Sequence, residues 1–247
     1  MDITKTNSFE LATFSRGDKD SRRLAILIPG RLDTKDYVNF TSHAGYLASR
    51  GFLAVAFDPP GTWESPGGID LFTTTNYLKA INELIEYFGN RPTLLLGHSR
   101  GASVAILASM TNAAIMGIVP VMANFETPTA PTEDAMRKGF QISYRDMPPG
   151  ASKTKEQKEF ALPIAYWTDG ARYDIEHALR GGTKPKLLIY GTHDEFTSVD
   201  VVKKLYEEIP EPKMIQAIDA THDYRYFPEA VEAVNLAVGK WLENNLI

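Results

Sequence analysis

Six short runs of almost purely apolar residues, spread along the whole chain, constrain its fold more than any other feature of the sequence. Amphipathic, helix-like stretches alternate with them. A run that is apolar throughout is typical of a strand covered on both faces, and such strands alternating with helices form parallel sheets. The sequence therefore predicts an α/β fold with a doubly wound, mostly parallel sheet. The runs are residues 24–28, 52–57, 93–96, 115–122, 186–190 and 214–218.

Two of the intervening helices can be located from the spacing of their apolar residues. Residues 77–88 and 228–242 each carry one apolar stripe at helical spacing, and Pro228 suits the first position of a helix. We expect both stripes to pack on the sheet. Near the N-terminus, residues 8–14 and 22–27 flank a polar turn, which predicts an antiparallel hairpin.

Residues 124–184 interrupt the alternation. They hold no clean strand, several prolines and glycines, and scattered aromatic residues. The stretch is too long for a plain connection inside a compact domain. We expect it to form an inserted, mainly helical cap on a core made of residues 1–123 and 185–247.

The composition excludes several classes of protein. The chain has 247 residues and no cysteine, so disulfides, thiolate metal sites and cysteine nucleophiles are excluded. A net charge of -5 without a basic cluster argues against a nucleic-acid partner. There is no H-E-x-x-H or P-loop motif, so neither a metal nor a nucleotide cofactor is expected. No signal peptide and no apolar stretch of about 18 residues is visible, and we expect a cytoplasmic protein without a membrane span.

The segment Gly97-His98-Ser99-Arg100-Gly101 matches the pattern G-x-S-x-G. A strand is predicted to end at Gly97 and a helix to begin at Arg100, which is the context this pattern requires. A strand that turns abruptly into a helix exposes the side chain at the turn, and only small residues fit on either side of it. The N-terminus of the helix also supplies free N–H groups that favour negative charge. We therefore expect Ser99 to be a nucleophile.

A serine nucleophile needs a base, and the base in turn needs an orienting acid. In this class of fold the order along the chain is serine, acid, histidine. The two histidines before Ser99 are therefore excluded as the base. His222 follows the last predicted strand and precedes the last helix, where a loop reaches the carboxyl edge of the sheet. His193 is adjacent to the best acid candidate, and His177 falls in the expected cap. His222 is therefore the predicted base.

Asp194 is the predicted acid. It lies just past Gly191 at the end of the strand at residues 186–190. Its neighbour Glu195, and Glu126 after the preceding strand, remain alternatives.

These segments together resemble the α/β-hydrolase superfamily over essentially the whole chain outside the cap. By this resemblance the acid falls on Asp194, and the backbone N–H groups of Arg100 and Arg31 would form the oxyanion hole. The chain departs from the usual pattern at Pro29, where a histidine is common, and at Ala102, where a glycine is common. Neither position supplies a catalytic side chain, although both weaken assignment to a subfamily.

The resemblance implies acyl transfer, and we expect the substrate to be a small carboxylic ester, with Trp63 and Trp167 as candidate pocket residues. The same residues could serve a thioesterase, an amidase, a carbon–carbon bond hydrolase or an acyltransferase, because a fold does not fix the chemistry. A non-catalytic protein that holds a small ligand is a further alternative.

Overall fold

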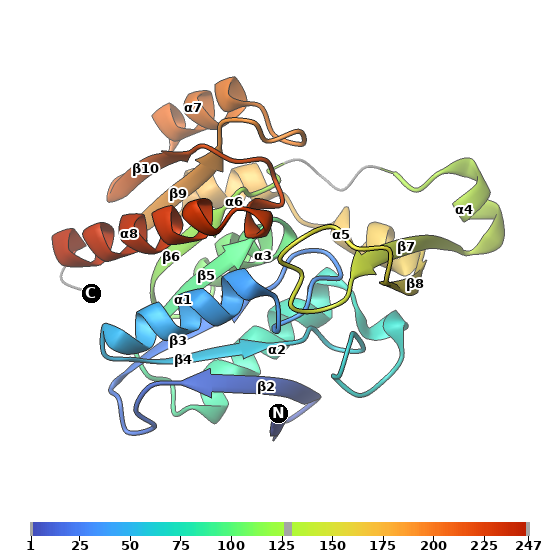
Figure 1. Cartoon of the computed structure of the whole chain (residues 1–247), viewed down its shortest axis with the longest axis horizontal. Coiled ribbons are helices and arrows are strands. Elements are labelled where there is room, and N and C mark those ends of the chain that lie inside the picture. Colours follow the sequence, from blue (N-terminus) through green and yellow to red (C-terminus); the bar gives the residue numbers. More distant parts are fainter. Residues whose placement is uncertain (1, 126–129, 246–247) are drawn as a thin grey trace.

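The computed structural model describes residues 2–125 and 130–245. Its centre is one eight-stranded sheet in the order β1-β2-β4-β3-β5-β6-β9-β10 (Figure 1). All neighbours from β4 to β10 pair in parallel, so the predicted doubly wound, mostly parallel fold class is confirmed. The strands of this sheet are β1 (Asp2–Lys5), β2 (Glu10–Arg16), β3 (Arg23–Ile28), β4 (Phe52–Phe57), β5 (Thr93–His98), β6 (Ile115–Val121), β9 (Lys186–Gly191) and β10 (Lys213–Ile218).

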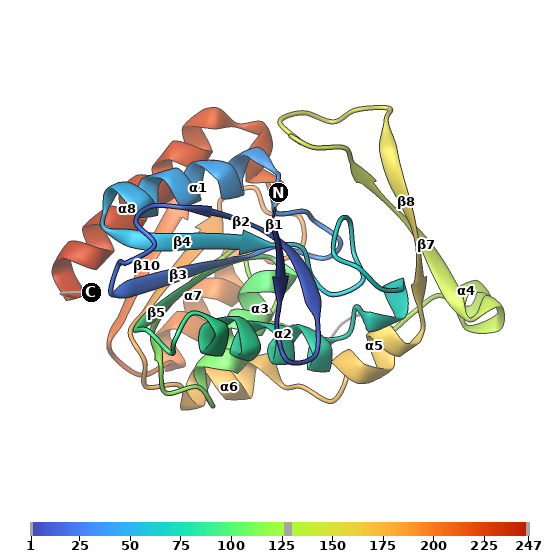
Figure 2. The ribbon, with the colours of Figure 1, turned by 90° about the horizontal axis from the view of Figure 1, so that it is seen from below.

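Helices cover both faces of the sheet (Figure 2). On one face, Phe40 and Trp241 join a buried cluster with Leu27 of β3, and on the other Leu84 and Val104 join a cluster with Ile26. The first layer holds α1 (Val38–Ser49) and α8 (Pro228–Asn245), and the second holds α2 (Thr74–Tyr87), α3 (Arg100–Ser109), α6 (Ile175–Gly181) and α7 (Val199–Glu208). Both helices predicted from apolar spacing are confirmed, as α2 and α8.

The predicted hairpin between residues 8–14 and 22–27 is wrong. Strand β2 pairs antiparallel with β1 and with β4, while β3 pairs in parallel with β4 and β5. Because β3 is central, both of its edges already have parallel partners and no edge remains for β2. The polar turn between them instead carries the chain across β4.

The expectation that residues 124–184 hold no clean strand is also wrong. Strands β7 (Phe140–Asp146) and β8 (Gln157–Pro163) form a second, two-stranded antiparallel sheet. The hairpin stands apart from the main sheet, and short helices flank it (Figure 2). These are α4 (Glu133–Lys138) and α5 (Ala165–Gly170). Of the two short 3-10 turns, η1 (Ile69–Leu71) contacts β8 and η2 (Tyr224–Tyr226) contacts α8.

The carboxyl ends of the parallel strands meet at one edge of the sheet, and the loops that follow them carry the predicted site residues. Arg31 follows β3, Ser99 follows β5, Asp194 follows β9 and His222 follows β10. In open α/β sheets ligands bind at this edge. The fold thus gathers four segments that are far apart in the sequence.

Candidate active site

Ser99 lies at the turn between β5 and α3 in a backbone conformation that residues with side chains rarely adopt. Its φ is 52° and its ψ is -118°. The Ser99 N–H donates to the carbonyl oxygen of Val121 at 2.9 Å, which ties the turn to β6. Gly101 permits the close approach of the helix to β3, because a Cβ atom there would collide with the Ile28 carbonyl oxygen. The strand, turn and helix expected around Ser99 are therefore present.

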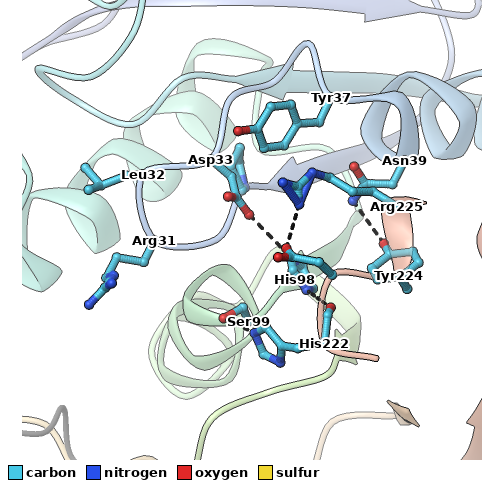
Figure 3. A network of polar contacts seen from close by, with 12 residues as sticks. Arg31, Leu32, Asp33, Tyr37, Asn39, His98, Ser99, His222, Tyr224 and Arg225 are labelled. Atoms are coloured by element: carbon cyan, nitrogen blue, oxygen red, sulfur yellow. Dashed lines mark hydrogen bonds and ion pairs between the residues drawn. The ribbon is translucent and has the colours of Figure 1, made fainter. Parts of the chain in front are cut away.

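The structure brings Ser99, His222 and Asp194 together in one chain of hydrogen bonds. The Ser99 Oγ lies 2.8 Å from His222 Nε2. On the other side of the ring, His222 Nδ1 lies 3.1 Å and 3.0 Å from the two carboxylate oxygens of Asp194. An ionised carboxylate only accepts, so Nδ1 carries a proton and Nε2 is free to accept one from the hydroxyl. Figure 3 shows the His222 ring against Ser99.

Asp194 is held in its ionised form. Burial by itself would raise the pKa of this carboxyl, but the His222 ring and two backbone N–H groups hold it below its ordinary value. Those groups belong to Phe196 and Thr197, at 2.9 Å and 3.2 Å from Oδ1. The turn after β9 therefore holds the Asp194 carboxylate in place and favours its ionised form.

The alternative acid Glu195 contacts a different part of His222. Its Oε2 accepts the backbone N–H of His222 at 3.1 Å, and the ring nitrogens bond elsewhere. Glu195 thus positions the main chain of the loop and does not face the imidazole. Glu126, the other alternative, lies outside the described residues.

A second histidine and aspartate, which the sequence analysis did not select, lie beneath the site (Figure 3). His98 is almost completely buried, and its Nε2 donates to the main-chain oxygen of His222 at 3.0 Å. Its Nδ1 lies 3.3 Å from Asp33 Oδ2. Burial would raise the pKa of Asp33, but His98 and Arg145 lower it to about 2. Chain order excludes His98 as the base. Its position inside the G-x-S-x-G motif, the sharp strand-to-helix elbow around Ser99, is the only signal in the sequence that it supports the site.

The two residues proposed to line an oxyanion hole both border the same cavity as Ser99. Arg100 is the first residue of α3, so its backbone N–H has no carbonyl one turn earlier in the helix to bond to. Arg31 lies in the loop after β3. A Cβ atom at Gly30, next to it, would collide with the Asp33 carboxylate, so a glycine there leaves room for this carboxylate beside His98.

The cavity above Ser99 has a volume of about 520 Å³. Trp167, on α5, lines it as expected, together with Tyr144 from β7 and Tyr226 beyond β10. Trp63 is not among the lining residues. Its ring lies edge-on to Phe160 of β8 with 5.5 Å between centroids, and its Nε1 donates to the Leu32 carbonyl at 2.8 Å. Trp63 thus connects the β7–β8 hairpin to the loop after β3.

Among the described residues, Asp36, Asp58 and Glu64 form the one carboxylate cluster with a spacing that could suit a metal. The Lys35 ammonium already lies between them, with Nζ at 2.6 Å, 3.3 Å and 2.5 Å from the three carboxylates. Burial alone would lower the pKa of Lys35, but these carboxylates hold it above its ordinary value. The cluster is an ion-pair network that fixes the loop after β3.

No helix in the described ranges, 2–125 and 130–245, has the length and apolarity needed to cross a membrane.

A family model described as alpha/beta hydrolase family matches residues 25–234, which is most of the chain. The chain belongs to the alpha/beta hydrolase family. Among curated proteins, none matches this alpha/beta hydrolase in sequence.

Solved structures share the architecture of this alpha/beta hydrolase over nearly its whole length. Est1E from Butyrivibrio proteoclasticus, solved with ferulic acid bound, is 18% identical, with a TM-score of 0.78 and 100% and 99% of the two chains covered. A monoacylglycerol lipase of Paleococcus ferrophilus is 21% identical, with a TM-score of 0.75 and coverage of 96% and 99%. A thioesterase domain from the curacin biosynthetic pathway is 15% identical, with a TM-score of 0.71 and coverage of 96% and 98%. At these identities the similarity is one of fold.

Proposed function

We propose that this alpha/beta hydrolase is a serine hydrolase that cleaves a small carboxylic ester through an acyl-enzyme on Ser99. The observation that carries the proposal is the 2.8 Å contact between Ser99 Oγ and His222 Nε2, with the Asp194 carboxylate on the far side of the ring. A hydroxyl is a weak nucleophile until an adjacent base accepts its proton. This arrangement supplies the base and holds it in the tautomer that can accept.

In the first step, Ser99 Oγ attacks the carbonyl carbon of the ester while His222 Nε2 takes the hydroxyl proton. The carbonyl oxygen becomes an oxyanion, and the backbone N–H groups of Arg100 and Arg31 stabilise it. Each main-chain donor of this kind is worth about 10² to 10³ in rate. The bond to the alcohol then breaks, and the departing oxygen receives the proton from His222. The ionised Asp194 stabilises the imidazolium that exists between these two events.

In the second step, water replaces the alcohol. His222 takes a proton from the water as its oxygen attacks the acyl carbon, and the oxyanion forms again at the same donors. The bond to Ser99 Oγ then breaks and the serine recovers its proton from His222. The carboxylic acid leaves and the enzyme returns to its starting state.

The cap is proposed to shape the substrate pocket. We assign it to residues 124–184 on a core of residues 1–123 and 185–247. Trp167 and Tyr144 from this segment line the cavity above Ser99, where they supply apolar contact area for the substrate.

The test is a panel of p-nitrophenyl esters from acetate to octanoate, with a thioester and an anilide of the preferred acyl group. We expect a short ester to be hydrolysed, and Ser99→Ala to lower kcat/KM by at least about 10³-fold. Ser49→Ala, at an exposed serine on α1, is the matched control and should leave the rate unchanged. A Ser99→Ala protein as active as the wild type would contradict the mechanism. Faster turnover of the thioester or anilide would contradict the ester as substrate.

A further inference from the structure

The cavity above Ser99 carries an excess of positive charge on a chain that is acidic overall. The whole sequence has a formal net charge of -5. The cavity is nevertheless lined by five cationic side chains and only three carboxylates. A local charge opposite to that of the whole molecule indicates attraction of a ligand and is not a general surface property. The cationic residues are Arg31, Arg100, Arg145, Lys153 and Arg225, and the carboxylates are Asp33, Asp146 and Asp223.

The three carboxylates are already engaged by two of these arginines. Arg225 bonds to Asp146 at 2.7 Å and to Asp223 at 2.5 Å. Arg145 lies 3.4 Å from Asp33 and also donates to the Arg31 carbonyl at 2.8 Å. None of the three forms an ion pair or a hydrogen bond with Arg31 or Arg100, and only Asp33 acts on Arg31 through space.

The Arg31 guanidinium lacks a hydrogen-bonded or ion-paired partner within residues 2–125 and 130–245, and it interacts with Tyr166 and Asp33 only through space. Its side chain makes no hydrogen bond and no ion pair there, although the residue is half-buried. Figure 3 shows it extending from the loop on the side away from Asp33 and His98. Burial lowers the pKa of Arg31, and the nearby Tyr166 and Asp33 offset only part of this effect, to which the positive charge of Arg145 adds. A guanidinium charge at this half-buried position costs free energy unless an opposite charge compensates it.

Arg100 is nine-tenths buried and, among the described residues, also lacks a carboxylate partner. Its guanidinium donates to the Thr74 hydroxyl and lies over the ring of Tyr166, 5.6 Å from the centroid. Tyr166 also interacts electrostatically with Arg31, so the two arginines flank the same aromatic residue. Guanidinium groups present fixed, planar donors that match the oxygens of carboxylates and phosphates.

We propose that Arg31 and Arg100 bind an anionic oxygen group, a carboxylate or a phosphate, on the substrate. The inference rests on the proposed function and narrows its substrate class to esters that carry a negative charge in the acyl or the alcohol part. Both arginines line the cavity that contains Ser99, so the anion would bind in the same cavity as the scissile bond. Hydrogen bonds to charged groups are worth more than neutral ones, and each arginine should contribute at least about tenfold to kcat/KM for the charged substrate.

Two matched pairs of esters test the proposal. For the acyl side, the p-nitrophenyl monoester of adipic acid is compared with p-nitrophenyl hexanoate. For the alcohol side, 4-acetoxybenzoate is compared with its methyl ester. In each pair the quantity measured is the ratio of kcat/KM for the charged ester to that for the neutral ester. Comparing this ratio between wild type and variant cancels the intrinsic reactivity of the two esters.

We expect this ratio to fall at least about tenfold for one of the two pairs, both in Arg31→Gln and in Arg100→Gln. A fall in kcat/KM that is equal for the charged and the neutral ester does not change the ratio. Arg137→Gln makes the same substitution at an exposed residue of α4 outside the cavity, and should leave the ratio unchanged. Competition by benzoate and by phenyl phosphate, measured against benzyl alcohol, separates a carboxylate site from a phosphate site. An unchanged ratio for both pairs in both variants would overturn the proposal.

Binding to the Ser99→Ala protein separates failure of this inference from failure of the proposed function. At least one charged ester should bind at least about tenfold more tightly than its neutral partner, even if no ester is turned over. Equal binding of both pairs would contradict the anion site while leaving the esterase mechanism intact. Tight, charge-selective binding without any turnover by the wild type would uphold the anion site and contradict the esterase.

Discussion

His98 Nε2 donates to the main-chain oxygen of His222 at 3.0 Å, so the buried histidine of the elbow motif supports the loop that carries the proposed base. The other nitrogen of His98 faces Asp33 at 3.3 Å. The loops after β3 and β10 are thereby joined to the end of β5 beneath Ser99.

His98 is therefore a positioning residue for His222. We expect His98→Gln to lower kcat by about 10- to 100-fold with little change in KM, because a small displacement of the base mainly affects the chemical step. The rate is normalised to active sites titrated with a fluorophosphonate, so that unfolded protein does not count. His177→Gln, at an exposed histidine, is the control. A His98→Gln protein with full kcat per titrated site would show that the residue only stabilises the fold.

Asp33 should make stability depend on pH in the acid range. Its pKa is about 2 in the folded protein, against an ordinary 3.8, and the group is buried. A carboxyl with a lowered folded pKa contributes stability that is complete above its unfolded pKa and is lost as pH falls through the folded value. The difference corresponds to about 2 kcal/mol. Asp33→Asn should lower the unfolding free energy by about this amount at pH 6, and the gap should shrink between pH 4 and pH 2.

Urea unfolding at a series of pH values measures this gap. The exposed Asp219, changed to Asn, is the control and should leave the curve unaltered. A gap that is constant from pH 6 to pH 3 would mean that the ionisation of Asp33 is not the cause.

The acid of the proposed triad can be identified by two amide substitutions. Asp194→Asn should lower kcat/KM by about 10⁴-fold, because an amide cannot hold the ring in the accepting tautomer. Glu195→Gln should cost less than about tenfold, since its carboxylate contacts only the backbone N–H of His222. Steady-state kinetics at pH 8 on one ester measure both. A larger loss in Glu195→Gln than in Asp194→Asn would reverse the assignment.

The close approach of α3 to β3 can be tested through Gly101. A Cβ atom there would collide with the Ile28 carbonyl oxygen, so Gly101→Ala should destabilise the protein by about 1–3 kcal/mol or more. Gly45→Ala is the matched control, because a Cβ at this exposed helical position meets nothing within 4 Å. It should raise stability by about 0.5–1 kcal/mol. Thermal denaturation compares the two, and equal melting temperatures would contradict the packing described.

The sheet could be predicted because its parallel strands are covered on both faces and so consist of continuous apolar runs. The strands and helix ends outside these runs are harder to predict from the sequence. In β7 the apolar residues Phe140, Ile142 and Tyr144 do alternate, but they are exposed, while the polar Ser143 on the opposite face is buried. A strand that inverts the usual pattern does not stand out among polar and glycine-rich neighbours. The apolar stripe predicts that α2 begins at residue 77, whereas the helix begins at Thr74, because Thr73 caps it before the stripe begins.

The contacts among Ser99, His222 and Asp194, the residues of the proposed triad, could be anticipated because motif, chain order and position after a strand all restrict them. The supporting pair His98 and Asp33 could not, nor could Arg31 and Arg100, which have no carboxylate ion pair among the described residues. Their roles depend on which loops meet and which charges are already paired, and neither follows from spacing along the chain. Arg225, for example, is neutralised by Asp146 at the end of β7, which the sequence does not place nearby.

The central claim is that Ser99 is a nucleophile activated by His222. Intact-protein and peptide mass spectrometry after treatment with a fluorophosphonate tests it directly. We expect one adduct on the wild type, located on the peptide that contains Ser99, no adduct on Ser99→Ala, and labelling slowed by at least about 10²-fold in His222→Gln. An adduct that persists in Ser99→Ala, or labelling of His222→Gln at the wild-type rate, would contradict the account.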